Sequence, residues 1–166
     1  MNPEIPSLLS QFISFKTTVG NEAQKAACLD WIQEQFLNAV DREPVGGEVD
    51  GAPYLYLEHP NATWLWFAHI DVVPGSPEQF TLQQDGGRLI GRGVKDMKGA
   101  ALPFLMAYRD AMAADDNPPV SILLTSDEET AGVTIPTLLQ NGTITSPPIA
   151  FTPDASGDQI VVEHKG

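Results

Sequence analysis

Apolar positions in the first forty residues recur at helical spacing in two segments. The first runs from Ile5 to Ile13, and its proline is tolerated because it lies in the first turn of the helix. The second begins at Asn21, a residue type that caps helices, and ends around Asn38–Asp41. Both apolar stripes predict amphipathic helices that pack against a core.

Farther along the chain, the pattern changes to short apolar runs of strand length, each bounded by proline, glycine, asparagine or aspartate. Helix-like stretches separate them, a long one from about Lys98 to Ala114 and a short one from Pro136 to Leu139. This alternation indicates an α/β fold with a largely parallel sheet flanked by helices. The predicted strands are Tyr54–Leu57, Trp64–Ala68, Val120–Thr125, Ile149–Thr152 and Ile160–Val162.

The segment from Phe80 to Ile90 does not fit that alternation. Its centre, Asp85-Gly86-Gly87, has the residue types of a tight hairpin turn and lies between two short β-like pieces. We therefore expect a small hairpin that projects from the main sheet. No internal repeat or linker-like tract interrupts the sequence, so its 166 residues are expected to form one domain.

Charge and cysteine content narrow the classes of partner. The chain has 22 acidic and 9 basic residues, a net charge of −13, which repels nucleic acid and anionic lipid surfaces. Cys28 is the single cysteine, which excludes an internal disulfide and a cysteine-based metal cage. Because the sequence also shows no signal peptide and no membrane-spanning apolar stretch, we expect a soluble cytoplasmic protein.

Three predicted strands each lead into a residue that can bind a metal. The second leads into His69-Ile70-Asp71, the third into Asp127-Glu128-Glu129 and the fourth into Asp154. Ligands of open α/β sheets bind beyond the carboxyl ends of the strands, so these loops are expected to converge. Asp96, in a glycine-punctuated loop ahead of the long helix, adds another carboxylate. One imidazole and several carboxylates suit divalent zinc, cobalt or manganese.

Three sequence blocks carry a resemblance to a known enzyme family. They are Ala68–Pro74 (AHIDVVP), Gly91–Gly99 (GRGVKDMKG) and Thr125–Gly132 (TSDEETAG). In this order and spacing they resemble the signature blocks of the acetylornithine deacetylase / succinyl-diaminopimelate desuccinylase family of dinuclear metallopeptidases and deacylases. The resemblance extends over nearly the whole chain. It implies a zinc-exopeptidase-like catalytic domain that hydrolyses amide bonds in N-acyl amino acids.

The resemblance also implies a set of metal ligands. His69, Asp96 and Asp154 would bind one divalent ion, and Asp96 and Glu129 would bind a second, with Asp96 as the bridge. Zinc is the expected metal, with cobalt or manganese as alternatives. A cis peptide bond is implied directly after the bridging aspartate.

Neighbouring polar residues receive other interpretations. By the same resemblance, Glu128 is the catalytic general base that takes a proton from a metal-bound water. Asp71, also assigned to the catalytic group, would orient the ligating imidazole by accepting its other N–H. Asp127 is interpreted as a position that tolerates variation. His59 is expected to be exposed in a turn, and His164 is not expected to touch the site.

Two departures from the family pattern bear on the substrate. Asp154 stands where deacylases and carboxypeptidases usually have glutamate, whereas aspartate is more usual in aminopeptidase- and dipeptidase-like members. The stretch Pro74–Phe80 lacks the tryptophan-containing form common in desuccinylases. An N-acyl amino acid such as acetylornithine or succinyl-diaminopimelate remains the expected substrate, with a short peptide as the alternative.

Family members are typically more than twice this length. The resemblance therefore implies that residues 1–166 form the N-terminal portion of the catalytic domain, without the lid/dimerisation domain and the C-terminal catalytic portion of a homodimeric enzyme. The absent part would supply a histidine to the second metal. We therefore expect the chain alone to bind at most one divalent ion well and to be inactive, which leaves a non-catalytic metal-binding fragment as an alternative. A dinucleotide site is disfavoured because Gly91-x-Gly93 lacks the third glycine.

Overall fold

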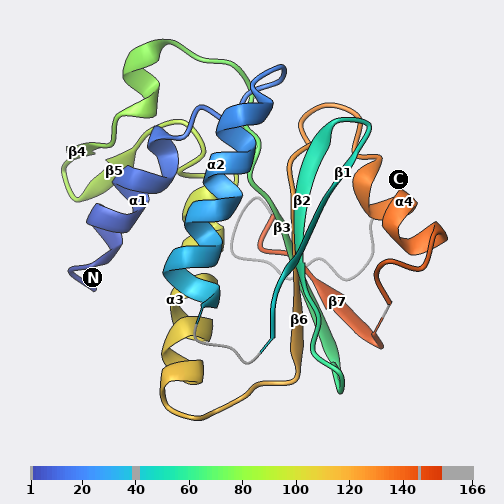
Figure 1. Ribbon diagram of the computed structural model, residues 1–166. Helices are drawn as coiled ribbons and strands as arrows, with labels where there is room; N and C mark the ends of the chain where they lie inside the picture. Colours follow the sequence, from blue (N-terminus) through green and yellow to red (C-terminus); the bar gives the residue numbers. More distant parts are fainter. Residues whose placement is uncertain (1, 39–41, 146, 155–166) are drawn as a thin grey trace.

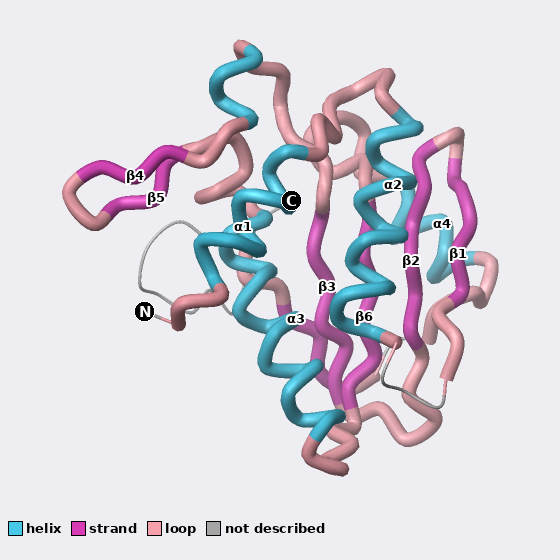
Figure 2. The backbone as a smooth tube through the Cα atoms, turned by 60° about the vertical axis from the view of Figure 1, so that its left-hand side comes forward, coloured by secondary structure: helices cyan, strands magenta, loops and turns pink. Residues whose placement is uncertain are grey.

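A five-stranded sheet forms the centre of the computed structural model, which describes residues 2–38, 42–145 and 147–154. Helices α1, α2 and α3 cover one face of the sheet and α4 covers the other (Figures 1 and 2). Within the described residues, no helix combines the length and apolar content that a membrane crossing requires. The elements are α1 (Ile5–Ser14), α2 (Glu22–Ile32), the π-helix η1 (Gln33–Leu37), β1 (Val45–Val49), β2 (Ala52–Leu57), β3 (Trp64–His69), the 3-10 helix η2 (Pro77–Phe80), β4 (Gln83–Asp85), β5 (Arg88–Ile90), α3 (Lys98–Ala113), β6 (Val120–Thr125), α4 (Thr134–Gln140) and β7 (Ile149–Phe151).

The α/β prediction is confirmed, and parallel pairing occupies one half of the sheet, whose strand order is β1-β2-β6-β3-β7. β3 pairs in parallel with β6 and β7, whereas β2 pairs antiparallel with β1 and β6. The hydrophobic pattern does not predict β1, because Val45–Val49 contains two glycines and no continuous apolar run. The predicted strand Ile160–Val162 lies outside the described residues.

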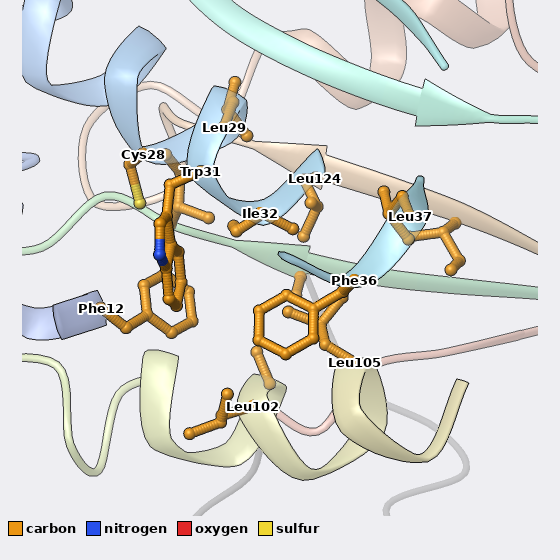
Figure 3. Packing of buried hydrophobic residues seen from close by; sticks show 14 of the residues in the cluster. Phe12, Cys28, Leu29, Trp31, Ile32, Phe36, Leu37, Leu102, Leu105 and Leu124 are labelled. Atoms are coloured by element: carbon orange, nitrogen blue, oxygen red, sulfur yellow. The ribbon is translucent and has the colours of Figure 1, made fainter. Parts of the chain in front are cut away.

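The central strands are buried on both faces, which explains their continuous apolar runs. In β6, Ile122 and Leu124 belong to the core beneath α1, α2 and α3, whereas Leu123 belongs to a smaller cluster that includes residues of α4. In the larger core, Phe12 of α1 packs against Trp31 of α2, with ring centroids 5.3 Å apart (Figure 3). These contacts fix α1 and α2 over the strands that end at the site described below.

The predicted hairpin is present as a two-stranded sheet separate from the main one. Asp85 pairs with Arg88 across the turn, and the two residues between them, Gly86 and Gly87, have φ angles of +52° and +82°. Residues with side chains rarely adopt this left-handed region, so two glycines suit a two-residue hairpin turn. The hairpin lies away from the central sheet, as Figure 2 shows.

Candidate metal centre

The candidate site lies where the parallel strands β3, β6 and β7 end. His69 is the last residue of β3, and Thr125 and Phe151 are the last residues of β6 and β7. Parallel strands present their carboxyl ends at one edge of the sheet, so the loops that follow them meet there. The loop ahead of α3 reaches the same edge and brings Asp96 close to His69.

One buried imidazole nitrogen faces a set of open carboxylates. His69 Nε2 lies 3.1 Å from Asp96 Oδ1, 3.6 Å from Glu128 Oε2 and 3.8 Å from Asp154 Oδ2. The His69 side chain is 2% exposed, whereas those of Asp96 and Glu128 are 61% and 53% exposed. Two overlapping groups have donor atoms within 4.8 Å of one another: His69 with Asp96 and Asp154, and His69 with Glu128 and Glu129. The structure therefore brings all four predicted ligands and the predicted base into one cluster.

Asp71 contacts both His69 and the segment that carries Glu128 and Glu129. His69 Nδ1 donates to the main-chain carbonyl of Asp71 at 3.0 Å, while the nearer Asp71 carboxylate oxygen is 3.5 Å away. Because a carbonyl oxygen only accepts, this contact places a proton on Nδ1 and leaves Nε2 facing the carboxylates. The Asp71 carboxylate accepts the main-chain N–H groups of Glu128 (3.3 Å) and Glu129 (2.9 Å). Asp71 thus orients the imidazole mainly through its backbone and the two glutamates through its side chain.

The residues Asp96 to Gly99 explain how the loop ahead of α3 is fixed. The peptide bond between Asp96 and Met97 is cis, as the resemblance implies. Lys98 is fully buried, and its Nζ donates to the carbonyls of Phe12 (3.1 Å) and Phe15 (2.9 Å) at the end of α1. Unpaired carbonyls at a helix C-terminus favour such a cation. The loop is therefore tied to α1 two residues after the candidate ligand Asp96.

Electrostatics at the cluster favour a bound cation. Burial lowers the pKa of His69, but its contact with the Asp71 side chain and the negative charges of Asp71, Glu128 and Asp154 raise it to about 9. Burial raises the pKa of Glu129, and the charge of Asp96 adds to that rise. Within the described residues, no lysine or arginine forms an ion pair with these carboxylates. The donor set, one imidazole and several carboxylate oxygens, therefore fits a divalent metal ion.

The buried Lys98 gives stability a predictable pH dependence. Burial lowers its pKa from 10.5 to about 8, so above pH 8 the unfolded state binds more protons at this lysine, and the Lys98 contribution to the free energy of unfolding rises with pH. We expect Lys98 alone to contribute a rise of about 1 kcal/mol between pH 8 and 9. His69 opposes it in the same window, because its pKa is raised to about 9 and its stabilising contribution is lost as the pH rises through that value. Above pH 9 the buried Cys28 thiol also opposes it, because burial raises the pKa of that thiol to about 12. The difference in free energy of unfolding between the unaltered chain and Lys98→Met isolates the Lys98 contribution, and urea denaturation at several pH values measures it; a difference that stays constant between pH 8 and 9 would contradict the assignment.

Other polar residues behave differently from the cluster. Asp127 Oδ2 accepts the Thr134 N–H at 2.9 Å and so caps α4, and Asp127 is in neither candidate ligand group. The expectation that His59 is exposed is wrong: it is 8% exposed, and its Nδ1 accepts the N–H of Asn61 at 3.1 Å. His164 lies outside the described residues.

The hydrophobic pattern gives no sign of one buried residue that supports the site. Thr17 Oγ1 donates to the carbonyl of Ile70 at 2.6 Å, and the Thr17 carbonyl accepts the N–H of Val72 at 3.1 Å. These bonds fix the segment that carries Asp71 against the loop after α1. No sequence motif identifies such a contact, because it depends on two segments 53 residues apart.

A pocket of about 300 Å³ opens beside Glu128. Its lining includes Thr125 at the end of β6, Thr130 and Gly132 in the loop that follows, and Ile135 in the first turn of α4. The pocket therefore provides space for part of a ligand next to the carboxylate cluster.

Comparisons with known proteins give matches over most of the chain. The family model described as Peptidase family M20/M25/M40 matches residues 65–157. The succinyl-diaminopimelate desuccinylase of Sulfurovum sp. is 30% identical over 177 aligned residues, which cover 98% of this chain and 46% of that protein. The enzyme of the same name from Paracidovorax citrulli is 44% identical over 78 residues, 42% of this chain and 20% of that protein.

Solved structures show the same fold. An M20 family metallo-carboxypeptidase from Sulfolobus solfataricus has a TM-score of 0.75 at 20% identity, covering 95% of this chain and 38% of that one. Human carnosine dipeptidase 1 has a TM-score of 0.69 at 15% identity, covering 83% and 35%. The present chain thus spans less than half the length of each of these relatives.

Proposed function

The chain belongs to peptidase family M20/M25/M40, and we propose that it is the metal-binding part of a hydrolase that cleaves amide bonds. The observation that carries this proposal is the convergence of His69 Nε2 with the carboxylates of Asp96, Glu128 and Asp154 at one edge of the sheet. A cluster that only stabilised the fold would not require several exposed carboxylates around one imidazole. A hydrolytic metal centre requires such carboxylates, because they bind the cation and move protons.

In this proposal His69, Asp96 and Asp154 hold one divalent ion, and Asp96 and Glu129 hold a second. Zinc is the proposed metal, with cobalt or manganese as alternatives. The proximity of the first three donors supports the first site, and the assignment of Asp96 and Glu129 to the second rests on the family resemblance. The bound cations would polarise the scissile carbonyl and stabilise the negative charge that develops on its oxygen.

Glu128 is the proposed general base. Its carboxylate is half exposed and lies 3.6 Å from His69 Nε2, so it can reach both solvent and the centre of the cluster. It would take a proton from the attacking water and return it to the leaving amine. Asp71 assists by holding the main-chain N–H of Glu128 and the ring of His69 in one arrangement.

The proposed substrate is an N-acyl amino acid, because the two relatives described above, 44% and 30% identical, are named succinyl-diaminopimelate desuccinylase. A dipeptidase or aminopeptidase activity is the second candidate, favoured by the aspartate at position 154. Assays of a longer protein that includes this chain on acetylornithine, succinyl-diaminopimelate and a dipeptide panel separate the two. The family resemblance further supports a cytoplasmic homodimer for that longer protein.

For the 166-residue chain alone, we expect one tightly held divalent ion and no measurable amide hydrolysis. The first site has the three protein ligands of an ordinary catalytic zinc centre, whereas the second has only the two carboxylates of Asp96 and Glu129. Elemental analysis after dialysis against zinc, together with the same assays, measures both quantities. Two tightly held ions, or clear turnover, would show that another residue of this chain completes the second site. An absence of bound metal would contradict the proposal at its base.

A further inference from the structure

We propose that Met97 is a positioning residue that fixes the separation of the ligands His69 and Asp96 by accepting a hydrogen bond from the His69 main chain. The inference rests on the proposed function, because it concerns the geometry of the same metal centre. The His69 N–H donates to Met97 Sδ at 3.1 Å, and both residues are buried. A thioether sulfur is a weak, uncharged acceptor, so it can serve a polar group while remaining part of an apolar core.

The sheet itself leaves the His69 N–H without a partner. β3 lies between β6, which pairs along its whole length as far as His69, and β7, which pairs only as far as Trp66. The next residue, Ile70, donates its N–H to Thr125 of β6. Since successive N–H groups along a strand point to opposite sides, the His69 N–H points to the side on which β7 has already ended at Phe151. Met97 Sδ occupies the place that a carbonyl of a longer β7 would take.

A buried main-chain donor without an acceptor is costly, so the contact constrains the backbone of His69. Met97 directly follows Asp96, whose Oδ1 lies 3.1 Å from His69 Nε2. Two consecutive residues therefore contact one histidine, at its ring and at its backbone. This double contact links the relative position of the two ligands to a single short segment.

The backbone of Met97 is held in place by hydrogen bonds around it. Its carbonyl accepts the N–H groups of Ala100 (3.0 Å) and Ala101 (2.9 Å), so Met97 is the N-cap residue of α3. The next residue, Lys98, is tied to the end of α1. With its backbone fixed in this way, Met97 holds the end of β3 in place, and replacing its sulfur should loosen the His69 backbone more than the core.

Two substitutions test the role of the sulfur atom. Met97→Leu keeps an apolar side chain of similar volume and removes the acceptor, whereas Met97→Gln has similar length and supplies an amide oxygen. In the metal-free chain, we expect Met97→Leu to speed hydrogen exchange of the His69 amide about tenfold. We also expect it to weaken Co²⁺ binding about tenfold, measured by competition with a chelator. Met97→Gln should restore most of both.

The matched control is Met106→Leu, because Met106 is a buried methionine of the same core. It should leave His69 exchange and Co²⁺ affinity unchanged. Equal losses in both leucine variants would show that packing alone matters and would overturn the proposal, as would unchanged values in Met97→Leu. Should Met97→Leu not fold, rapid exchange of the His69 amide in the unaltered chain would overturn it as well. If the unaltered chain binds no Co²⁺, the proposed function fails, while the exchange measurement still decides the role of Met97.

Discussion

In a longer protein that includes this chain, Glu128→Gln is expected to lower kcat by about 100-fold to 10,000-fold and to leave the metal content unchanged. Glutamine has the size of glutamate but cannot accept a proton at neutral pH. The main-chain N–H of residue 128 remains bonded to Asp71 in the variant, so the loop stays in place. The loss should therefore appear in kcat and only weakly in KM.

Glu129→Gln is the informative comparison, because the chemical change is identical and the residue is adjacent. We expect it to lower the occupancy of the second metal, which elemental analysis of the purified variant measures. Asp127→Asn is the matched control, since Asp127 belongs to the same acidic triplet but caps α4. Its kcat per folded molecule should match that of the unaltered protein. Near-normal turnover in Glu128→Gln, or metal loss equal to that of Glu129→Gln, would mean that the base is another group.

Gly99→Ala is expected to destabilise the fold by about 3 kcal/mol and to abolish metal binding. A Cβ at this position would overlap the carbonyl oxygen of Val94 and lie 2.9 Å from its carbonyl carbon. These are backbone atoms, so the clash is relieved only if the loop ahead of α3 moves, and Asp96 moves with it. Helix propensity alone predicts the opposite sign, because alanine stabilises a helix interior relative to glycine by about 1 kcal/mol.

Urea denaturation and zinc analysis of the same samples measure both parts of this prediction. Gly46→Ala is the control, since the nearest atom to its added Cβ is 3.9 Å away. It should change stability by less than about 1 kcal/mol and leave metal binding intact. A stable, metal-binding Gly99→Ala variant would contradict this prediction, because it would show that the loop has space for a Cβ at position 99.

The strands that lead to the site are predictable from sequence, whereas the order of the sheet is not. β2, β3 and β6 are continuous apolar runs because both of their faces are buried. Burial of both faces also removes any sequence sign of strand direction, since an apolar run such as that of β2 has the same pattern whether it pairs in parallel or antiparallel. The antiparallel half of the sheet can be predicted only if β1 is recognised as a strand, and the two glycines of β1 interrupt its apolar pattern. His59 shows the same limit, because its burial depends on how its turn packs against the rest of the chain.

The candidate ligands are predictable for a different reason, because a metal ligand must be one of a few residue types. His69 and Asp154 can be recognised in the sequence because each follows an apolar run of strand length. Asp96 can be recognised because it lies in a glycine-rich loop. Met97 and Thr17 carry no such sign, since their contacts use an ordinary side chain and a main-chain group. The Asp71 side chain illustrates the point further: its place beside His69 is implied by the family resemblance, but its bonds to two glutamate N–H groups follow from the loop geometry alone.

The contacts around the candidate metal centre also determine when in folding it can form. His69 and Met97 are 28 residues apart, Asp71 and Glu128 are 57 apart, and Lys98 and Phe12 are 86 apart. Contacts between such distant residues require closure of long loops, and folds rich in them form slowly. In a chain that has formed only its local hairpins, the candidate ligands are still far apart and cannot bind one metal ion together. Metal binding at the proposed site would therefore require completed tertiary structure, and a cation supplied during refolding should leave early folding steps unchanged while stabilising the final state.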